Sequence, residues 1–228
     1  MVNKHIGRLI VFEGIDGSGK ATQAKLLLEF LAKEKIPTEF VSFPRYDSVW
    51  GKMIRRYLDG DFGKVDEVNP YLASVLYAGD RASAAPQVQK WLTDGKIVVC
   101  DRYVGSNMAH MGGKIKNLAS PVGRQKLKIK FIEWLEKLEY QENKIPREDL
   151  VIFLSVPVLI SQKLMDGRKL DIHEADVSYL KEVTEVYETL VQSRKNWVKI
   201  ECVQNGSLFS PEVIHQKVLE VLKQRKVL

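Results

Sequence analysis

The strongest constraint in this sequence is a glycine-rich segment that stands between a strand-like run and a helix-like run. Residues 8–14 are mostly apolar and end in glycine, which predicts a strand buried on both faces. Residues 14–20 then have the pattern glycine, four residues, glycine, lysine. Glycines at these positions let backbone N–H groups converge on phosphate oxygens, next to the positive end of a helix. The pattern therefore predicts a phosphate-binding loop.

The rest of the chain alternates between strand-like and helix-like segments. Strands are expected at 38–44, 96–100, 150–156 and 198–203, and helices at 20–35, 50–58, 70–92, 125–140, 158–165, 177–197 and from 210 onward. Alternation of this kind predicts an α/β fold: a five-stranded parallel sheet with helices on both faces. Because the 228 residues contain no linker, repeat or low-complexity tract, we expect a single domain over residues 1–228.

Composition excludes several classes of protein. Hydrophobic residues make up 45% and charged residues 28%, the mix of a soluble globular protein rather than of a disordered chain. An apolar run of about 18 residues is missing, so no membrane span is expected, and the first residues carry no secretory signal pattern. Cys100 and Cys202 lie in apolar stretches and are expected to be reduced core residues of a cytoplasmic protein. The formal net charge of +6 suits an acidic partner, either nucleic acid or a phosphorylated small molecule.

The glycine-rich segment also supplies candidates for metal binding. Ala21 stands where such loops usually carry the Ser or Thr that ligates Mg²⁺. Mg²⁺ keeps several waters, so it is expected to be held through water and acidic side chains such as Asp16 or Asp101. The expected phosphate-binding residues are Gly14, Ile15, Asp16, Gly17, Ser18, Gly19, Lys20, Ala21 and Thr22.

Two further strand ends carry basic side chains. Arg45 follows the second strand and Arg102 the third, each beside an aromatic or acidic residue. Ligands of parallel α/β sheets bind beyond the carboxyl ends of the strands, so both arginines are expected to share a crevice with Lys20. Because arginine binds phosphate through two parallel hydrogen bonds, the arrangement predicts a second ligand that carries phosphate.

The helix expected from residue 70 adds Tyr77 and Arg81, which lie on one face at i, i+4 spacing. A nucleoside monophosphate fits such a pair, with the ring against the base and the guanidinium on the phosphate. Core packing of Tyr77 and an ion pair between Arg81 and a surface carboxylate are the alternatives. Farther on, the charged segment 163–176 predicts a lid over the phosphates.

Together these features resemble the thymidylate kinase family of P-loop nucleoside monophosphate kinases. The resemblance is carried, in order, by residues 12–20, Phe43-Pro44-Arg45, Asp80-Arg81 and the string from Asp101 to Asn107. It implies the three-layer sandwich of P-loop NTP hydrolases and transfer of the γ-phosphoryl group of ATP to dTMP, with Mg²⁺, for dTTP biosynthesis. It also implies a homodimer that binds nucleotides rather than nucleic acid or membranes.

The resemblance assigns roles to individual positions. Candidates for catalysis are Lys20, Asp16, Arg102 and Arg168, with Lys169 the second choice for the lid cation. By this resemblance, the monophosphate would be clamped by Arg45, Arg81 and Arg102. Tyr77 would stack on thymine, and Asn107 would contact the pyrimidine edge. Phe43 and His110 complete the substrate site, and His110 stands where the family commonly has Tyr or Gln near the sugar. The metal candidates are Asp16, Asp101 and Glu174. The cations of the site would offset the roughly six negative charges of the two nucleotides.

Other functions remain open at this point. The acceptor could be another nucleoside monophosphate or a deoxynucleoside. A P-loop regulatory or nucleic-acid-binding module would instead bind DNA in a salt-sensitive way and transfer no phosphate. The segment 114–145 matches no motif and is assigned no function.

Overall fold

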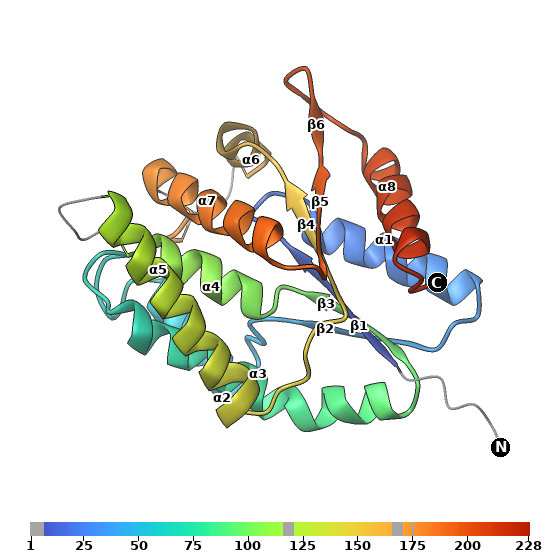
Figure 1. Cartoon of the computed structure of the whole chain (residues 1–228), viewed down its shortest axis with the longest axis horizontal. Coiled ribbons are helices and arrows are strands. Elements are labelled where there is room, and N and C mark those ends of the chain that lie inside the picture. Colours follow the sequence, from blue (N-terminus) through green and yellow to red (C-terminus); the bar gives the residue numbers. More distant parts are fainter. Residues whose placement is uncertain (1–6, 116–120, 166–170, 175) are drawn as a thin grey trace.

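The centre of the molecule is a parallel sheet (Figure 1). The computed structural model describes residues 7–115, 121–165, 171–174 and 176–228. Its five strands follow the order β2-β3-β1-β4-β5, and every neighbouring pair is parallel. The strands are β1 Arg8–Glu13, β2 Thr38–Ser42, β3 Ile97–Asp101, β4 Leu150–Ser155 and β5 Trp197–Glu201. The predicted sheet is confirmed.

Helices cover both faces of this sheet. Figure 1 shows α1 and α8 side by side on one face, with α3, α4, α5 and α7 on the opposite side. The helices are α1 Lys20–Lys33, α2 Val49–Leu58, α3 Pro70–Thr93, α4 Val104–Gly113, α5 Pro121–Glu136, the π-helix η1 Lys137–Glu142, α6 Val158–Leu164, α7 Val177–Ser193 and α8 Pro211–Gln224. A hairpin of β6 Val203–Gln204 and β7 Ser207–Leu208, which sequence patterns did not predict, separates β5 from α8.

The central strand β1 explains why its sequence is apolar throughout. Leu9 and Val11 belong to the hydrophobic core under α3, α4 and α7, whereas Ile10 and Phe12 belong to the core under α1 and α8. Each of these four side chains is at most 1% exposed. A strand that contributes to two cores has no polar face, so the three-layer arrangement predicted from the sequence is confirmed.

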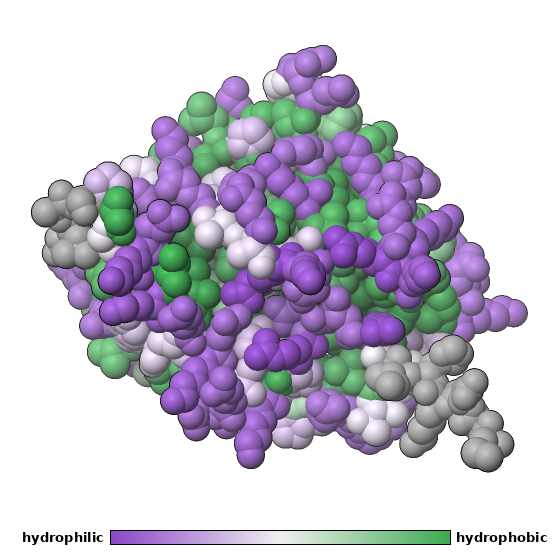
Figure 2. Space-filling view, viewed as in Figure 1, coloured by the Kyte–Doolittle hydropathy of each residue, from purple (hydrophilic) through white to green (hydrophobic). Residues whose placement is uncertain are grey.

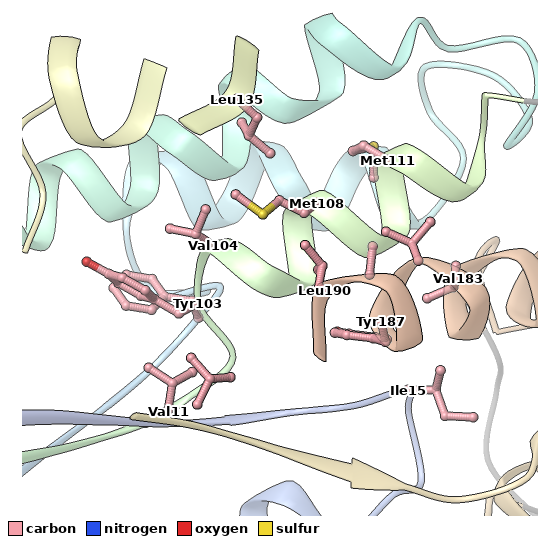
Figure 3. Close-up of a cluster of buried hydrophobic side chains, with 14 of the residues drawn as sticks. Val11, Ile15, Tyr103, Val104, Met108, Met111, Leu135, Val183, Tyr187 and Leu190 are labelled. Atoms are coloured by element: carbon pink, nitrogen blue, oxygen red, sulfur yellow. The ribbon is translucent and has the colours of Figure 1, made fainter. Parts of the chain in front are cut away.

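Helix α4 was not predicted, and its packing explains why. Every residue of α4 except Ser106 is buried, so the segment lacks the amphipathic period by which helices are found in sequences. Gly105 lies against Trp197, where an added Cβ would sit 2.5 Å from the ring, and Gly113 lies against Val183. Figure 3 shows Met108 and Met111 of α4 between α7 below and Leu135 above. Close helix packing thus requires the glycines that lower helix propensity.

Helix α3 begins as the sequence predicts. The Asn69 side chain accepts a hydrogen bond from the Tyr71 N–H, and Pro70 occupies the first turn, where no N–H is needed. The helix then runs for 24 residues and carries Tyr77, Asp80 and Arg81 past the carboxyl ends of β2 and β3.

The outer surface of the protein is mixed in character. The face in Figure 2 carries mainly hydrophilic residues with hydrophobic ones between them. Among the described residues, no helix combines the length and hydropathy that a membrane crossing requires.

Candidate active site

The glycine-rich loop joins β1 directly to α1. Gly14, Gly17 and Gly19 have φ values of 149°, 74° and 87°, in the region that side chains with a Cβ rarely adopt. Residues 16–23 line a cavity of about 580 Å³, whose other wall includes Leu208, Phe209, Pro211 and Ile214. The predicted phosphate-binding residues Gly14 and Ile15 are not among the described residues that line this cavity, and Ile15 is buried beneath the loop. The backbone needed for a phosphate cradle is therefore present at the start of α1.

Lys20 is buried at the first position of α1. Its Nζ donates a hydrogen bond of 2.8 Å to the Ile15 carbonyl oxygen, so the side chain folds back along the loop. Burial, followed by the positive charge of Arg102, lowers the pKa of Lys20 to about 8. An anion in the adjoining cavity would restore the charged form.

A second cavity, of about 300 Å³, opens at the carboxyl ends of β1, β2 and β3. Of the residues predicted to bind substrate, it is lined by Phe43, Tyr77, Arg81, Arg102, Asn107 and His110. Both cavities are bordered by Asp16, Phe43, Pro44, Tyr46 and Arg102. Two ligands of nucleotide size would therefore meet at Asp16 and Arg102.

Asp16 and Arg102 form an ion pair at this meeting point. Arg102 Nη2 donates to Asp16 Oδ1, and Nη1 donates to the Gly14 carbonyl oxygen at 3.2 Å and to Ser106 Oγ at 3.0 Å. Burial alone would raise the pKa of Asp16, but the charges of Arg102 and Lys20 hold that pKa well below its usual range. Asp16 is therefore anionic at neutral pH.

Comparisons with known proteins identify the family. The family model for thymidylate kinase matches residues 12–218. The chain belongs to the thymidylate kinase family. A protein of Thermococcus onnurineus described as a probable thymidylate kinase is 31% identical over 94% of this chain and 96% of its own. The thymidylate kinase of Plasmodium falciparum is 27% identical over 99% of this chain and 94% of its own. A solved thymidylate kinase structure from Candida albicans has a TM-score of 0.77 and 22% identity, covering 96% of this chain and 92% of that one.

The family assignment makes this chain an ATP-dependent nucleoside monophosphate kinase with a P-loop.

Glu13, at the end of β1, organises the start of α4. Glu13 Oε1 accepts hydrogen bonds of 2.9 Å from the backbone N–H groups of Tyr103 and Ser106, and Oε2 accepts one of 2.6 Å from Ser106 Oγ. Ser106 Oγ also accepts a hydrogen bond from Arg102, which in turn donates to Asp16. A continuous series of hydrogen bonds therefore connects the Glu13 carboxylate to the Asp16 carboxylate. Sequence reasoning did not single out Glu13, although it lies inside the family-like string of residues 12–20.

The three predicted arginines differ in their placement. Arg81 and Arg102 line the smaller cavity, whereas Arg45 is not among the described residues that do so. Arg45 Nη2 donates to Asp80 Oδ1 at 2.9 Å, and Asp80 Oδ2 accepts from the Arg45 N–H at 2.8 Å. This pair ties the loop after β2 to α3.

Each of the three arginines forms an ion pair with a carboxylate. Arg81 pairs with Glu139, Arg45 with Asp80 and Arg102 with Asp16. For Arg81 an ion pair was one of the alternatives raised by the sequence, but its partner Glu139 is buried rather than at the surface. Such pairs hold a guanidinium in a fixed orientation, because paired side chains lose their rotational freedom.

Two polar side-chain atoms of the smaller cavity lack hydrogen-bond partners within the described residues. The Asn107 Nδ2 group donates to the Ser74 carbonyl oxygen at 3.1 Å, while Asn107 Oδ1 is buried without a partner. The Nε2 atom of His110 is also buried and unpartnered, and its Nδ1 lies 3.3 Å from the Tyr179 hydroxyl. Burial, followed by the charge of Arg102, lowers the pKa of His110 to about 3, so its ring is neutral at pH 7. Asn107 Oδ1 can accept a hydrogen bond from a bound ligand.

The expected metal candidates do not gather at one point. Asp101 borders the larger cavity, Glu174 borders the smaller one, and Asp16 borders both. Within the described residues, no three histidine, cysteine or acidic side chains are arranged to hold a metal ion. The expected lid cations, Arg168 and Lys169, lie outside the described residues.

Sequence reasoning also missed residues of the smaller cavity. Tyr46 and Arg55 line it, with the Arg55 guanidinium 4.9 Å from the centre of the Tyr46 ring. His173 also lines it, 4% exposed, with its Nε2 2.8 Å from the Tyr57 hydroxyl. Arg55 and Tyr57 lie on α2, which was predicted as a helix but carried no motif.

Nucleotide affinity should depend on pH through Lys20. Above its pKa of about 8, the free enzyme increasingly holds a neutral lysine that must gain a proton to pair with phosphate. We expect ADP affinity to be nearly constant from pH 6.5 to 7.5 and to weaken toward about tenfold per pH unit well above pH 8. Calorimetry in two buffers of different ionisation enthalpy should show proton uptake on binding at pH 9. Constant affinity between pH 7 and pH 9 would contradict this assignment.

Proposed function

We propose that this chain transfers the γ-phosphoryl group of ATP to dTMP, producing dTDP and ADP. The observation that carries the proposal is the pair of cavities that meet at Asp16 and Arg102, in a chain with the family's P-loop. Transfer between two nucleotides depends mainly on placing them in line and stabilising charge, and neither requires a covalent intermediate on the protein.

The larger cavity suits ATP. Loop N–H groups and Lys20 would hold its phosphates, with the positive end of the 14-residue helix α1 aimed at them. Ala21 and Thr22 line the same cavity, and the apolar wall of Leu208, Phe209 and Ile214 suits a purine ring. On phosphate binding, the Lys20 Nζ would exchange its hydrogen bond to the Ile15 carbonyl oxygen for one to a phosphate oxygen.

The smaller cavity suits dTMP. Tyr77 and Phe43 offer aromatic surface to the base, and Asn107 Oδ1 offers an acceptor for the N3–H of thymine. Arg102 stands nearest the larger cavity, so it would bridge the acceptor phosphate and the transferred group. We retain Arg81 as a ligand contact and His110 as a contact near the sugar. Arg45 is proposed to support this site through Asp80 rather than to enter it.

Magnesium fits at Asp101. Asp101 Oδ1 is buried, has no hydrogen-bond partner in the described part of the chain and borders the cavity proposed for ATP. Mg²⁺ is commonly held by one or two carboxylates together with water and substrate phosphates. We therefore propose that Asp101, with Asp16 nearby, holds Mg²⁺ through water, while Glu174 is a less suitable ligand because it borders only the other cavity. When bound, the ion would neutralise charge on the β- and γ-phosphates.

Three further proposals complete the assignment. Residues 1–228 act as one kinase domain, in which segment 163–176 is the lid and Arg168, or Lys169 in its place, supplies a cation at the transferred phosphate. The enzyme is cytoplasmic, which is supported by two buried free thiols, and its partners are nucleotides rather than nucleic acid.

The enzyme is a homodimer whose subunits meet through α2 and α3. These helices carry exposed apolar residues, namely Val49, Trp50, Leu72 and Val75. Light scattering that gives twice the 26.1 kDa chain mass would support the dimer.

The Tyr77→Ala variant should separate the two nucleotide sites. Stacking on a base contributes about 1–3 kcal/mol, so we expect the KM for dTMP to rise roughly 5- to 150-fold. The KM for ATP should stay within about twofold, because Tyr77 lines only the smaller cavity. Tyr77→Phe, which keeps the ring, is the matched control. Equal increases in both KM values would remove Tyr77 from the base site.

A coupled assay of ADP release across all nucleoside monophosphates and deoxynucleosides tests the proposed function. We expect dTMP to give the highest kcat/KM. Preference for another monophosphate would assign a different acceptor, and turnover of an unphosphorylated deoxynucleoside would show that no acceptor phosphate is needed. Salt-sensitive DNA binding without any phosphoryl transfer would contradict the kinase assignment altogether.

A further inference from the structure

Glu139 lies in the segment to which the sequence assigned no function, and it is the partner of Arg81. Glu139 is fully buried in the π-helix η1, and Arg81 is 2% exposed in α3. Glu139 Oε1 accepts a hydrogen bond of 3.0 Å from Arg81 Nε and a second one from Nη2. Arg81 Nη1 donates to the Tyr103 carbonyl oxygen at 3.3 Å. Burial would lower the pKa of Arg81, but the Glu139 carboxylate raises it, so the guanidinium stays charged.

These contacts leave part of the guanidinium for a ligand. An arginine has five N–H groups in a fixed plane, about three of which are used here, so one N–H on each Nη remains. Arg81 lines the smaller cavity, whereas Glu139 is not among the described residues that line it. Glu139 thus contacts Arg81 from behind, on the side away from a bound nucleotide.

Stability alone is a poor explanation of this pair. A buried ion pair costs so much desolvation that apolar residues of similar volume often stabilise a core equally well. Here the cost is increased because Glu139 Oε2 is buried and has no hydrogen-bond partner among the residues that the structure describes. The backbone also departs from α-helical geometry over residues 137–142, and single π-helical turns recur at functional sites. Holding a charged arginine at the cavity wall gives the ion pair a role that stability does not.

We propose that Glu139 is a positioning residue, which orients Arg81 so that its two remaining N–H groups face the acceptor nucleotide. The inference rests on the proposed function, because it takes the smaller cavity as the acceptor site. It predicts that Glu139 affects the acceptor nucleotide and not ATP. It also predicts that Glu139 acts only through Arg81.

The test compares Glu139→Gln with Glu142→Gln, an exposed position of the same π-helix. Glu139→Gln should raise the KM for dTMP about 10- to 100-fold, as expected when a charge-assisted hydrogen bond is weakened, and leave the KM for ATP within about twofold. Glu142→Gln should leave both KM values unchanged. In an Arg81→Met background, adding Glu139→Gln should change the KM for dTMP less than about twofold.

Several results would overturn the inference. A folded Glu139→Gln enzyme with normal KM for dTMP would do so, as would equal increases for ATP and dTMP, or a full additive effect in the Arg81→Met background. Thermal unfolding monitors folding, and Glu139→Asp, which keeps the charge but shifts it by one methylene, provides a second variant if Glu139→Gln does not fold. Wild-type enzyme that fails to use dTMP would instead contradict the proposed function, and Glu139 would then be assessed with whichever monophosphate the wild type accepts.

Discussion

Lys20→Ala is expected to lower kcat for the ATP and dTMP reaction by at least about 100-fold, the usual cost of removing a preorganised transition-state donor. Lys20 is the basic side chain of the glycine-rich loop itself, and it is already buried at the cavity wall before any ligand binds. Its Nζ would reach the transferred group by giving up the hydrogen bond to the Ile15 carbonyl oxygen. Steady-state assays with both substrates saturating would measure the loss directly.

The control for this variant is Lys25→Ala, an exposed lysine one turn farther along α1. Its 3.9 Å contact with Glu29 is a surface pair, worth about 0–1 kcal/mol at most, so activity should be unchanged. Near-normal kcat in Lys20→Ala would mean that the loop binds something other than the transferred phosphate.

Arg102→Ala is expected to lower kcat/KM for dTMP by roughly 100- to 1000-fold, because Arg102 borders both cavities and would contact both nucleotides. The variant also leaves the Asp16 carboxylate without its ion-pair partner, and because this pair is only partly buried we expect a loss of folding stability below the about 3–5 kcal/mol of a fully buried pair. Activity and the free energy of unfolding must therefore be measured on the same preparation.

Two further variants separate these effects. Arg102→Ala combined with Asp16→Asn should recover stability, because the partly buried Asp16 charge is no longer left without its partner, yet it should remain inactive. Arg56→Ala, which removes an exposed arginine paired with Asp61, should change neither stability nor activity appreciably. Substantial activity in folded Arg102→Ala would exclude Arg102 from the reaction.

The sheet could be predicted from the sequence because its strands are buried on both faces. Residues such as Ile10 and Val11 leave few alternatives to an interior parallel strand, and the glycine-rich loop indicates that a helix comes directly after β1. Helix α4 could not be predicted in the same way. Its glycines are required by Trp197 and Val183, which lie far along the chain, and nothing local marks that requirement.

For the site, topology was predictable but side-chain partners were not. Strand ends of a parallel sheet necessarily converge, so Arg102 and Lys20 were correctly expected near one opening. Arg45 begins at the same edge, but its side chain turns to Asp80 instead. The partnership of Arg81 with Glu139 joins α3 to a segment 58 residues away, and helical spacing carries no information about such contacts.

The central claim is that the γ-phosphoryl group of ATP is transferred to dTMP rather than to water. ³¹P NMR with ATP labelled by ¹⁸O in its γ-phosphoryl group tests this most directly. We expect the label to appear in the β-phosphate of dTDP in equal amount to the ADP formed, with little inorganic phosphate. Label released as inorganic phosphate, with dTMP unchanged, would contradict the account.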